Sequence, residues 1–145
     1  MTNNLDYPFQ KIAVIDDSEM DRYILSRLAN KYCFSKEVLD FNMARKGLTY
    51  FEENLNNNIM LPEIIFLDIN MPEMNGFEFL EQFEAFPESI KKQVSIIVLT
   101  SSNNPADSER ALKNPLVCAY HNKPLNQDKL HQVIAQVRKT PVKVT

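Results

Sequence analysis

The chain of 145 residues contains only two glycines, Gly47 and Gly76, and they are far apart. The GxxxxGK and GxGxxG loops of many nucleotide-binding enzymes are therefore excluded, because both need closely spaced glycines. The two cysteines, Cys33 and Cys118, form neither a disulfide framework nor a metal-ligand spacing, and the two histidines match no zinc pattern. We expect both cysteines to be inert buried thiols.

An excess of positive charge is also missing, since 16 basic and 19 acidic residues give a net charge of -3. The chain thus lacks the basic footprint of a nucleic-acid-binding protein, and we expect no direct contact with nucleic acid. No apolar run approaches the ~20 residues of a membrane span. The start, MTNNLDYPFQK, lacks the order of a signal peptide. We therefore expect no membrane insertion and a cytoplasmic location.

Short apolar segments alternate with segments of helical periodicity along the chain. We expect strands at 11–15, 38–41, 64–67, 94–99 and 117–120, and helices at 19–32, 43–55, about 77–86, 106–113 and 126–138. Ser18 should cap the first helix, with Asp21 in the acidic position of a capping box. This order predicts an α/β fold, a doubly wound five-stranded parallel sheet with five helices, in one domain spanning 1–145 with its core at about 10–138.

Chemically active side chains follow four of the predicted strands. They are Asp16, Asp17, Asp68, Thr100 and Lys123. Each could be an ordinary turn residue, but the carboxyl ends of parallel strands share one edge, so all five should meet there. Three close carboxylates need cations, and oxygen ligands of this kind suit Mg²⁺. Asp68 could then act as a nucleophile that forms an acyl phosphate.

These residues resemble the receiver domain of bacterial two-component response regulators, in particular the stand-alone, chemotaxis-regulator-like kind. The resemblance covers roughly residues 10–138 and is carried by the acidic pair Asp16-Asp17, FLDINMPEMNG around Asp68, VLTSS and NKPL. It implies the flavodoxin-like receiver fold. It also implies that Asp68 accepts a phosphoryl group from a sensor histidine kinase or a histidine phosphotransfer protein, and that a downstream protein then binds.

The resemblance further implies a role for each neighbour of Asp68. Mg²⁺ would be held by Asp17, Asp68 and the main-chain carbonyl of Asn70, with Asp16 acting mostly through water. Lys123 would pair with the phosphoryl group, and Thr100 would hydrogen-bond it.

A switch and a shaped loop are implied as well. Thr100 would move toward the phosphoryl group while Tyr120 turns inward behind it. Pro72 and Gly76 would shape the loop after Asp68, with Gly76 also permitting an unusual backbone angle. The bond before Pro124 is cis in the family, which would direct the preceding lysine into the site.

Two alternatives belong to other classes. An aspartate-nucleophile phosphatase of the haloacid dehalogenase type needs an acid two residues after its nucleophile, where this chain has Asn70, and its second acidic pair follows the lysine. A receiver-like interaction module without phosphorylation would not need every functional position to be filled. We therefore expect a signalling phosphoacceptor that catalyses only its own phosphorylation and dephosphorylation. No DNA-binding helix pair follows residue 140, so we expect it to dock to a protein or pass the group onward.

Overall fold

The computed structural model describes residues 6–139, which contain one five-stranded sheet in the order β2-β1-β3-β4-β5. The strands are β1 (Phe9–Ile15), β2 (Ser35–Phe41), β3 (Ile64–Leu67), β4 (Ser95–Thr100) and β5 (Val117–Asn122). Every neighbouring pair is parallel, so all five carboxyl ends face the same edge. The strand order reverses at β1, which lies between β2 and β3, and ligand sites of such sheets lie at this position.

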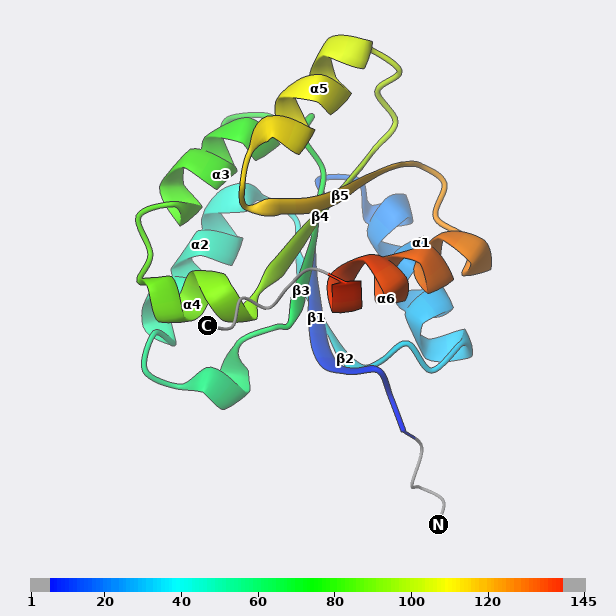
Figure 1. Cartoon of the computed structure of the whole chain (residues 1–145), viewed down its shortest axis with the longest axis horizontal. Coiled ribbons are helices and arrows are strands. Elements are labelled where there is room, and N and C mark those ends of the chain that lie inside the picture. The colour runs from blue at the N-terminus through cyan, green and yellow to red at the C-terminus, as the bar shows by residue number, and fades with distance from the viewer. Residues whose placement is uncertain (1–5, 140–145) are drawn as a thin grey trace.

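Helices cover both faces of the sheet (Figure 1). They are α1 (Glu19–Lys31), α2 (Ala44–Glu53), α3 (Gly76–Phe83), α4 (Glu88–Gln93), α5 (Pro105–Lys113) and α6 (Gln127–Lys139), with a 3-10 turn, η1, at Asn58–Met60. The α2, α3 and α4 helices lie on one face and α1 and α6 on the other, while α5 packs over β4 and β5. The predicted doubly wound α/β fold is thus confirmed.

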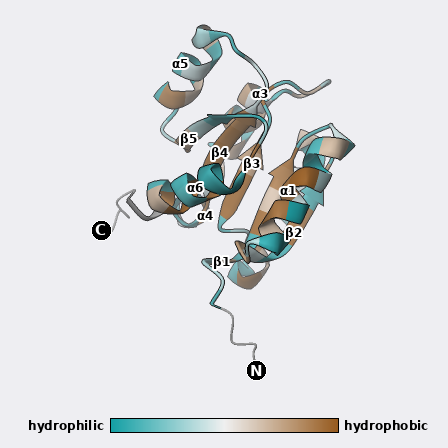
Figure 2. Cartoon of the chain, turned by 90° about the vertical axis from the view of Figure 1, so that its right-hand side faces the viewer, coloured by the Kyte–Doolittle hydropathy of each residue, from teal (hydrophilic) through white to brown (hydrophobic). Residues whose placement is uncertain are grey.

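The core has two layers because neighbouring residues of a strand point to opposite faces of the sheet. Ile15 and Ile65 pack toward α2 and α3, where Phe79 is completely buried. Val14 and Phe66 pack toward α1 and α6. Figure 2 shows the result as apolar strands between helices with polar outer faces. Strands apolar on both faces read as continuous hydrophobic runs, which is why β1 and β3 stand out in the sequence.

The prediction of five helices is wrong, because the described residues form six α-helices. The additional helix is α4, which begins after its N-cap residue Pro87. The helix expected at about 77–86 already ends at Phe83, before this proline. The six residues of α4 include a single buried residue, Ile90. So short a segment shows no periodicity that could distinguish it from a loop.

Smaller differences concern the edge of the sheet and the cysteines. Strand β2 begins at Ser35, three residues earlier than expected, because its polar start pairs with β1 without any apolar pattern. Cys33 and Cys118 form no disulfide bond and are only partly buried, so the expectation of two buried thiols is wrong. Within residues 6–139, no helix combines the length and apolar character needed to cross a membrane.

Candidate functional site

Three carboxylates meet at the carboxyl ends of β1 and β3. Asp16 and Asp17 follow β1 directly, and Asp68 follows β3. The backbone ladder continues past both strands, because the Asp68 amide donates to the Ile15 carbonyl at 3.0 Å. Asp16 and Asp68 are buried while Asp17 is exposed, and one oxygen of each acid lies within 4.8 Å of the other two. Rigid neighbouring strands therefore hold the three acids together, as the sequence predicted.

Lys123 enters the same site from the end of β5. Its amide donates to the Thr100 carbonyl at 2.8 Å, and the bond to Pro124 is cis. The ammonium nitrogen Nζ lies 2.7 Å from Asp16 Oδ2 and 3.5 Å from Asp68 Oδ2. The lysine nitrogen is thus closer to Asp16 than to Asp68.

The loop after Asp68 folds tightly around that residue. The Asn70 amide donates to Asp68 Oδ1 at 3.2 Å, which fixes one carboxylate oxygen. Gly76 matters here for space, because a Cβ atom on it would lie 2.7 Å from the Asp68 carbonyl oxygen and 2.6 Å from the Ile69 Cα. The expectation that Gly76 has an unusual backbone angle is wrong: Glu73 has the positive φ of this loop, at 66°. Pro72 lies exposed ahead of it.

The charges of the site do not balance, and the pKa values respond accordingly. Burial, together with the charge of Asp16, raises the pKa of Asp68 from 3.8 to about 6, although the Asn70 amide and Lys123 act in the opposite direction. Burial alone would lower the pKa of Lys123, but its hydrogen bonds to two acids outweigh this effect and raise that pKa. Lys123 is therefore a firm cation, and it does not compensate all the surrounding carboxylates.

The donor set fits a divalent cation. Asp16, Asp17 and Asp68 offer oxygen ligands only, which hard cations such as Mg²⁺ prefer. A divalent charge would also offset the repulsion that raises the pKa of Asp68.

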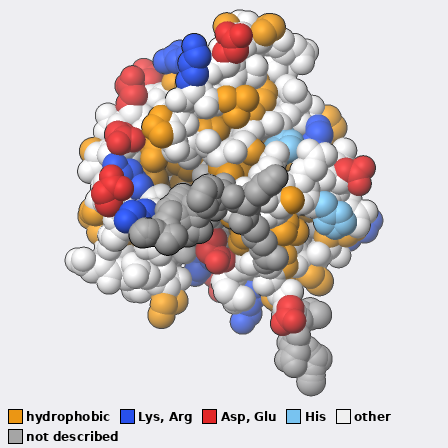
Figure 3. Space-filling view, viewed as in Figure 1, with side chains coloured by type: hydrophobic (Ala, Val, Ile, Leu, Met, Phe, Trp, Pro, Cys, Tyr) orange, Lys and Arg blue, Asp and Glu red, His pale blue; other side chains and the backbone are white. Residues whose placement is uncertain are grey.

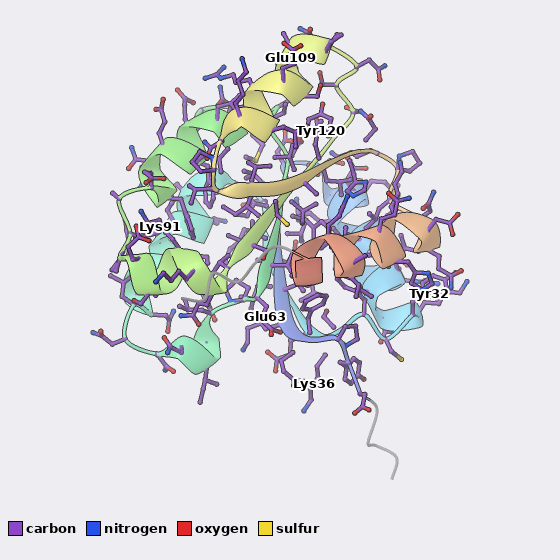
Figure 4. The ribbon with its side chains drawn as sticks, in the orientation of Figure 1. Tyr32, Lys36, Glu63, Lys91, Glu109 and Tyr120 are labelled. Atoms are coloured by element: carbon purple, nitrogen blue, oxygen red, sulfur yellow. The ribbon has the colours of Figure 1, made fainter. Side chains whose placement is uncertain are left out.

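Thr100, at the end of β4, connects the site to α5. Its hydroxyl is fully buried and accepts a hydrogen bond from the Ser102 amide at 3.2 Å. The Ser102 hydroxyl in turn donates to Asp107 Oδ2 in α5 at 2.6 Å. The Tyr120 hydroxyl donates to the Ser102 carbonyl at 3.5 Å, and Figure 4 shows this ring between β5 and α5. Thr100 and Tyr120 therefore meet the same short loop.

Two residues that contact the site, Asp21 and Arg22, were not predicted from the sequence to belong to it. The Asp21 amide does donate to Ser18 Oγ at 3.1 Å, but the Asp21 carboxylate does not complete a capping box. It lies 2.7 Å from Lys123 Nζ, which comes from a distant loop. Arg22 donates to the Asp16 carbonyl at 2.9 Å. No local pattern signals the Asp21 contact, because Lys123 lies 102 residues away along the chain.

Comparisons with known proteins identify the family of this chain. The model of the response regulator receiver domain family matches residues 12–135. Two-component response regulator ORR3 of rice (Oryza sativa subsp. indica) is 25% identical over 112 residues, which span 77% of this chain and 79% of ORR3. The crystal structure of a two-component response regulator from Cytophaga hutchinsonii has a TM-score of 0.83 at 24% identity and covers 90% of this chain and 98% of that one.

A third relative is response regulator Rcp1 from Synechocystis sp., 24% identical over 101 residues that span 69% of this chain and 67% of Rcp1. A crystal structure of the Mn²⁺-bound form of Rcp1 has a TM-score of 0.68 at 20% identity and covers 94% of this chain and 96% of that chain. With the family model matching most of its length, the chain belongs to the response regulator receiver domains of two-component systems.

Proposed function

We propose that Asp68 accepts a phosphoryl group from the phosphohistidine of a sensor histidine kinase or a histidine phosphotransfer protein. A carboxylate oxygen of Asp68 forms a bond to phosphorus while the bond from phosphorus to the imidazole nitrogen breaks. The electron pair of the broken bond stays on the imidazole. The observation that carries this proposal is a buried Asp68 carboxylate with Lys123 at 3.5 Å and two further acids beside it.

The site's other residues have assigned parts in this transfer. Asp17, Asp68 and the Asn70 main-chain carbonyl are the proposed ligands of Mg²⁺, with Asp16 acting through water. When bound, the cation offsets negative charge on the transferring group. The Mn²⁺-bound form of Rcp1 supports this, since a protein of similar fold holds a divalent cation. Lys123 pairs with the phosphoryl oxygens.

The proposed output is a change in the surface that α5, β5 and α6 form. The Thr100 hydroxyl turns toward the phosphoryl group and donates a hydrogen bond, and Tyr120 moves inward behind it. Supporting this, Ser102 contacts both residues through its amide and its carbonyl. Figure 3 shows apolar side chains gathered between α5 and β5, where a downstream protein would bind. Comparing proteins captured with and without a phosphoryl mimic would identify that partner. We place this signalling in the cytoplasm.

Neither alternative has comparable support. A haloacid dehalogenase-type phosphatase needs an acid where Asn70 lies, and the amide of that side chain cannot transfer a proton to a leaving group. Instead, the Asn70 side chain lies 3.5 Å from the Thr100 hydroxyl. An interaction module without phosphorylation would not need a lysine packed between buried acids. Burying such charges costs free energy, which a site without a function would not justify.

Labelling with a small phosphodonor tests the proposal. The purified chain is incubated with acetyl phosphate and Mg²⁺, and its intact mass is measured. We expect a gain of one phosphoryl group that is abolished in Asp68→Asn and by chelation of the metal. Asp128→Asn is the matched control, because it removes one exposed carboxylate from the first turn of α6, away from the acid cluster.

The result that would contradict the proposal is equally direct. Wild type that gains no mass from acetyl phosphate or from a phosphorylated histidine kinase is not a phosphoacceptor. Labelling that persists in Asp68→Asn would move the acceptor to another residue. Substantial turnover of small phosphomonoesters would instead favour the phosphatase.

A further inference from the structure

A fourth carboxylate contacts the site through Lys123 alone. Asp21 lies in the first turn of α1, and its side chain is about one third exposed. Among the described residues, the Asp21 carboxylate has one ion-pair or hydrogen-bond partner, the Lys123 ammonium, at 2.7 Å. It is not part of the group of acids that could hold a metal ion. Its contribution to the site must therefore act through the lysine.

The position of the ammonium shows how the lysine is divided between acids. An ammonium has three donor hydrogens, and Lys123 Nζ lies 2.7 Å from Asp16, 2.7 Å from Asp21 and 3.5 Å from Asp68. The two short contacts are typical of strong charge-assisted hydrogen bonds, whereas the third is at the outer limit. Asp21 thus helps to hold the ammonium away from the proposed phosphoacceptor.

We infer that Asp21 is a positioning residue that restrains Lys123 and competes with the phosphoryl group on Asp68 for its ammonium. This inference rests on the proposed function, because it concerns how tightly the phosphorylated state is held. A phosphoryl group brings several negative oxygens to Asp68, and these oxygens compete with Asp21 for the charge of Lys123. Asp21 therefore favours the unphosphorylated arrangement.

Binding of fluoroberyllate, a mimic of a phosphoryl group on a carboxylate, measures this competition at saturating Mg²⁺. We expect Asp21→Asn to bind fluoroberyllate about fivefold more tightly than wild type, the factor that ~1 kcal/mol gives for a partly exposed ion pair. If the Asp21 carboxylate only maintained the shape of the site, its removal would weaken fluoroberyllate binding. The sign of the change in affinity therefore separates competition for Lys123 from a purely structural role. Calorimetry or fluorine NMR reports the affinity.

Two variants complete the design. Glu19→Gln removes the same charge from the same exposed helical turn without a contact to Lys123, and it should leave the affinity at the wild-type value. Asp21→Glu restores the carboxylate and should return the affinity toward wild type. Thermal unfolding of each variant, measured in parallel, checks that the loss of an acid at the helix N-terminus affects stability similarly in Asp21→Asn and Glu19→Gln.

The outcomes distinguish this inference from the proposed function. Wild type that does not bind fluoroberyllate, or binding that survives in Asp68→Asn, overturns the proposed function. Wild type that binds at Asp68, with Asp21→Asn equal to or weaker than wild type, overturns the inference alone. Equal tightening in Asp21→Asn and Glu19→Gln also overturns it, because general charge then explains the effect.

Discussion

At the scale of single residues, the site is defined by an excess of carboxylates over cations, and two of the carboxylates are buried. Asp16 and Asp68 are almost fully buried, and Lys123 is shared between them and Asp21. Burial and repulsion from Asp16 raise the pKa of Asp68 to about 6. A divalent cation would offset this excess of negative charge, which reduces the stability of the metal-free fold.

The pKa of Asp68 predicts a stability that depends on pH without metal. Because this pKa is raised from 3.8 to about 6, the folded chain keeps a proton that the unfolded chain has lost between these values. The contribution of Asp68 is therefore fully present below about pH 4 and is lost as the pH rises through about 6. Relative to Asp68→Asn, the free energy of unfolding of wild type should fall by on the order of 2 kcal/mol over this pH range.

Urea denaturation of both proteins at several pH values, in the presence of a chelator, measures this difference. The comparison with the variant cancels the titration of the groups that do not interact with Asp68. A free energy difference that stays constant between about pH 4 and about pH 7 would contradict the raised pKa of Asp68.

At the scale of the elements, the start of α3 is fitted closely against the end of β3. The Asn75 side chain accepts from the Glu78 amide, and the Glu78 side chain accepts from the Asn75 amide, so α3 begins with a complete capping box. Gly76 lies inside that turn, and a Cβ atom on it would lie 2.7 Å from the Asp68 carbonyl oxygen. The loop that shapes the site and the helix that packs the core are therefore one unit.

Substitution of the two glycines tests this close fit. Gly76→Ala should destabilise the fold by about 1–3 kcal/mol, because the new Cβ would meet backbone atoms that cannot move without shifting Asp68. Gly47→Ala is the matched control: it lies inside α2, and its nearest neighbour at 2.7 Å is the end of the flexible Ile15 side chain. Alanine also favours a helix interior, so this variant should be close to neutral.

Chemical denaturation gives both stabilities, and labelling by acetyl phosphate gives the effect on Asp68. Gly76→Ala as stable as Gly47→Ala would show that the loop after β3 has room that the structure does not indicate.

At the scale of the whole molecule, one sheet separates two apolar layers, and both are needed to hold the strand ends in register. The layer beneath α2 and α3 is rich in aromatic rings: Phe79 lies 5.7 Å from Phe83, and Phe83 lies 5.1 Å from Phe51, between ring centroids. The other layer holds α1, which carries Asp21, and α6, which follows Lys123. The site therefore depends on packing from both sides of the sheet.

Truncation of one of these rings should weaken the entire fold. Phe79→Ala is expected to cost about 3–5 kcal/mol of unfolding free energy, since Phe79 is completely buried among other rings. Leu112→Ala, at a side chain that is 55% exposed on α5, should change stability by less than about 0.5 kcal/mol. A single cooperative transition in urea, seen equally by far- and near-ultraviolet circular dichroism, is the readout. Similar stabilities for the two variants would contradict the assignment of the core.

Prediction from the sequence succeeded where a pattern was local. Apolar runs such as Ile64–Leu67 identify strands buried on both faces. The polar residues that end these runs place the acids, Thr100 and Lys123 at one edge of the sheet. It failed for α4, which is too short to show a period, and for Gly76, whose role is set by a neighbour rather than by its own φ. Asp21 fitted a local capping pattern, and a stronger partner from a distant loop overrode it.

The sequence by itself determined the parallel α/β order and which side chains stand at the strand ends, because strand and helix periodicity are properties of neighbouring residues. Only the tertiary structure decided how those side chains share their charges. Lys123 is 102 residues from Asp21 and 55 from Asp68 along the chain, and only folding brings all three together. Lys123 Nζ lies 2.7 Å from Asp16 and Asp21 but 3.5 Å from Asp68, and no sequence pattern encodes this difference.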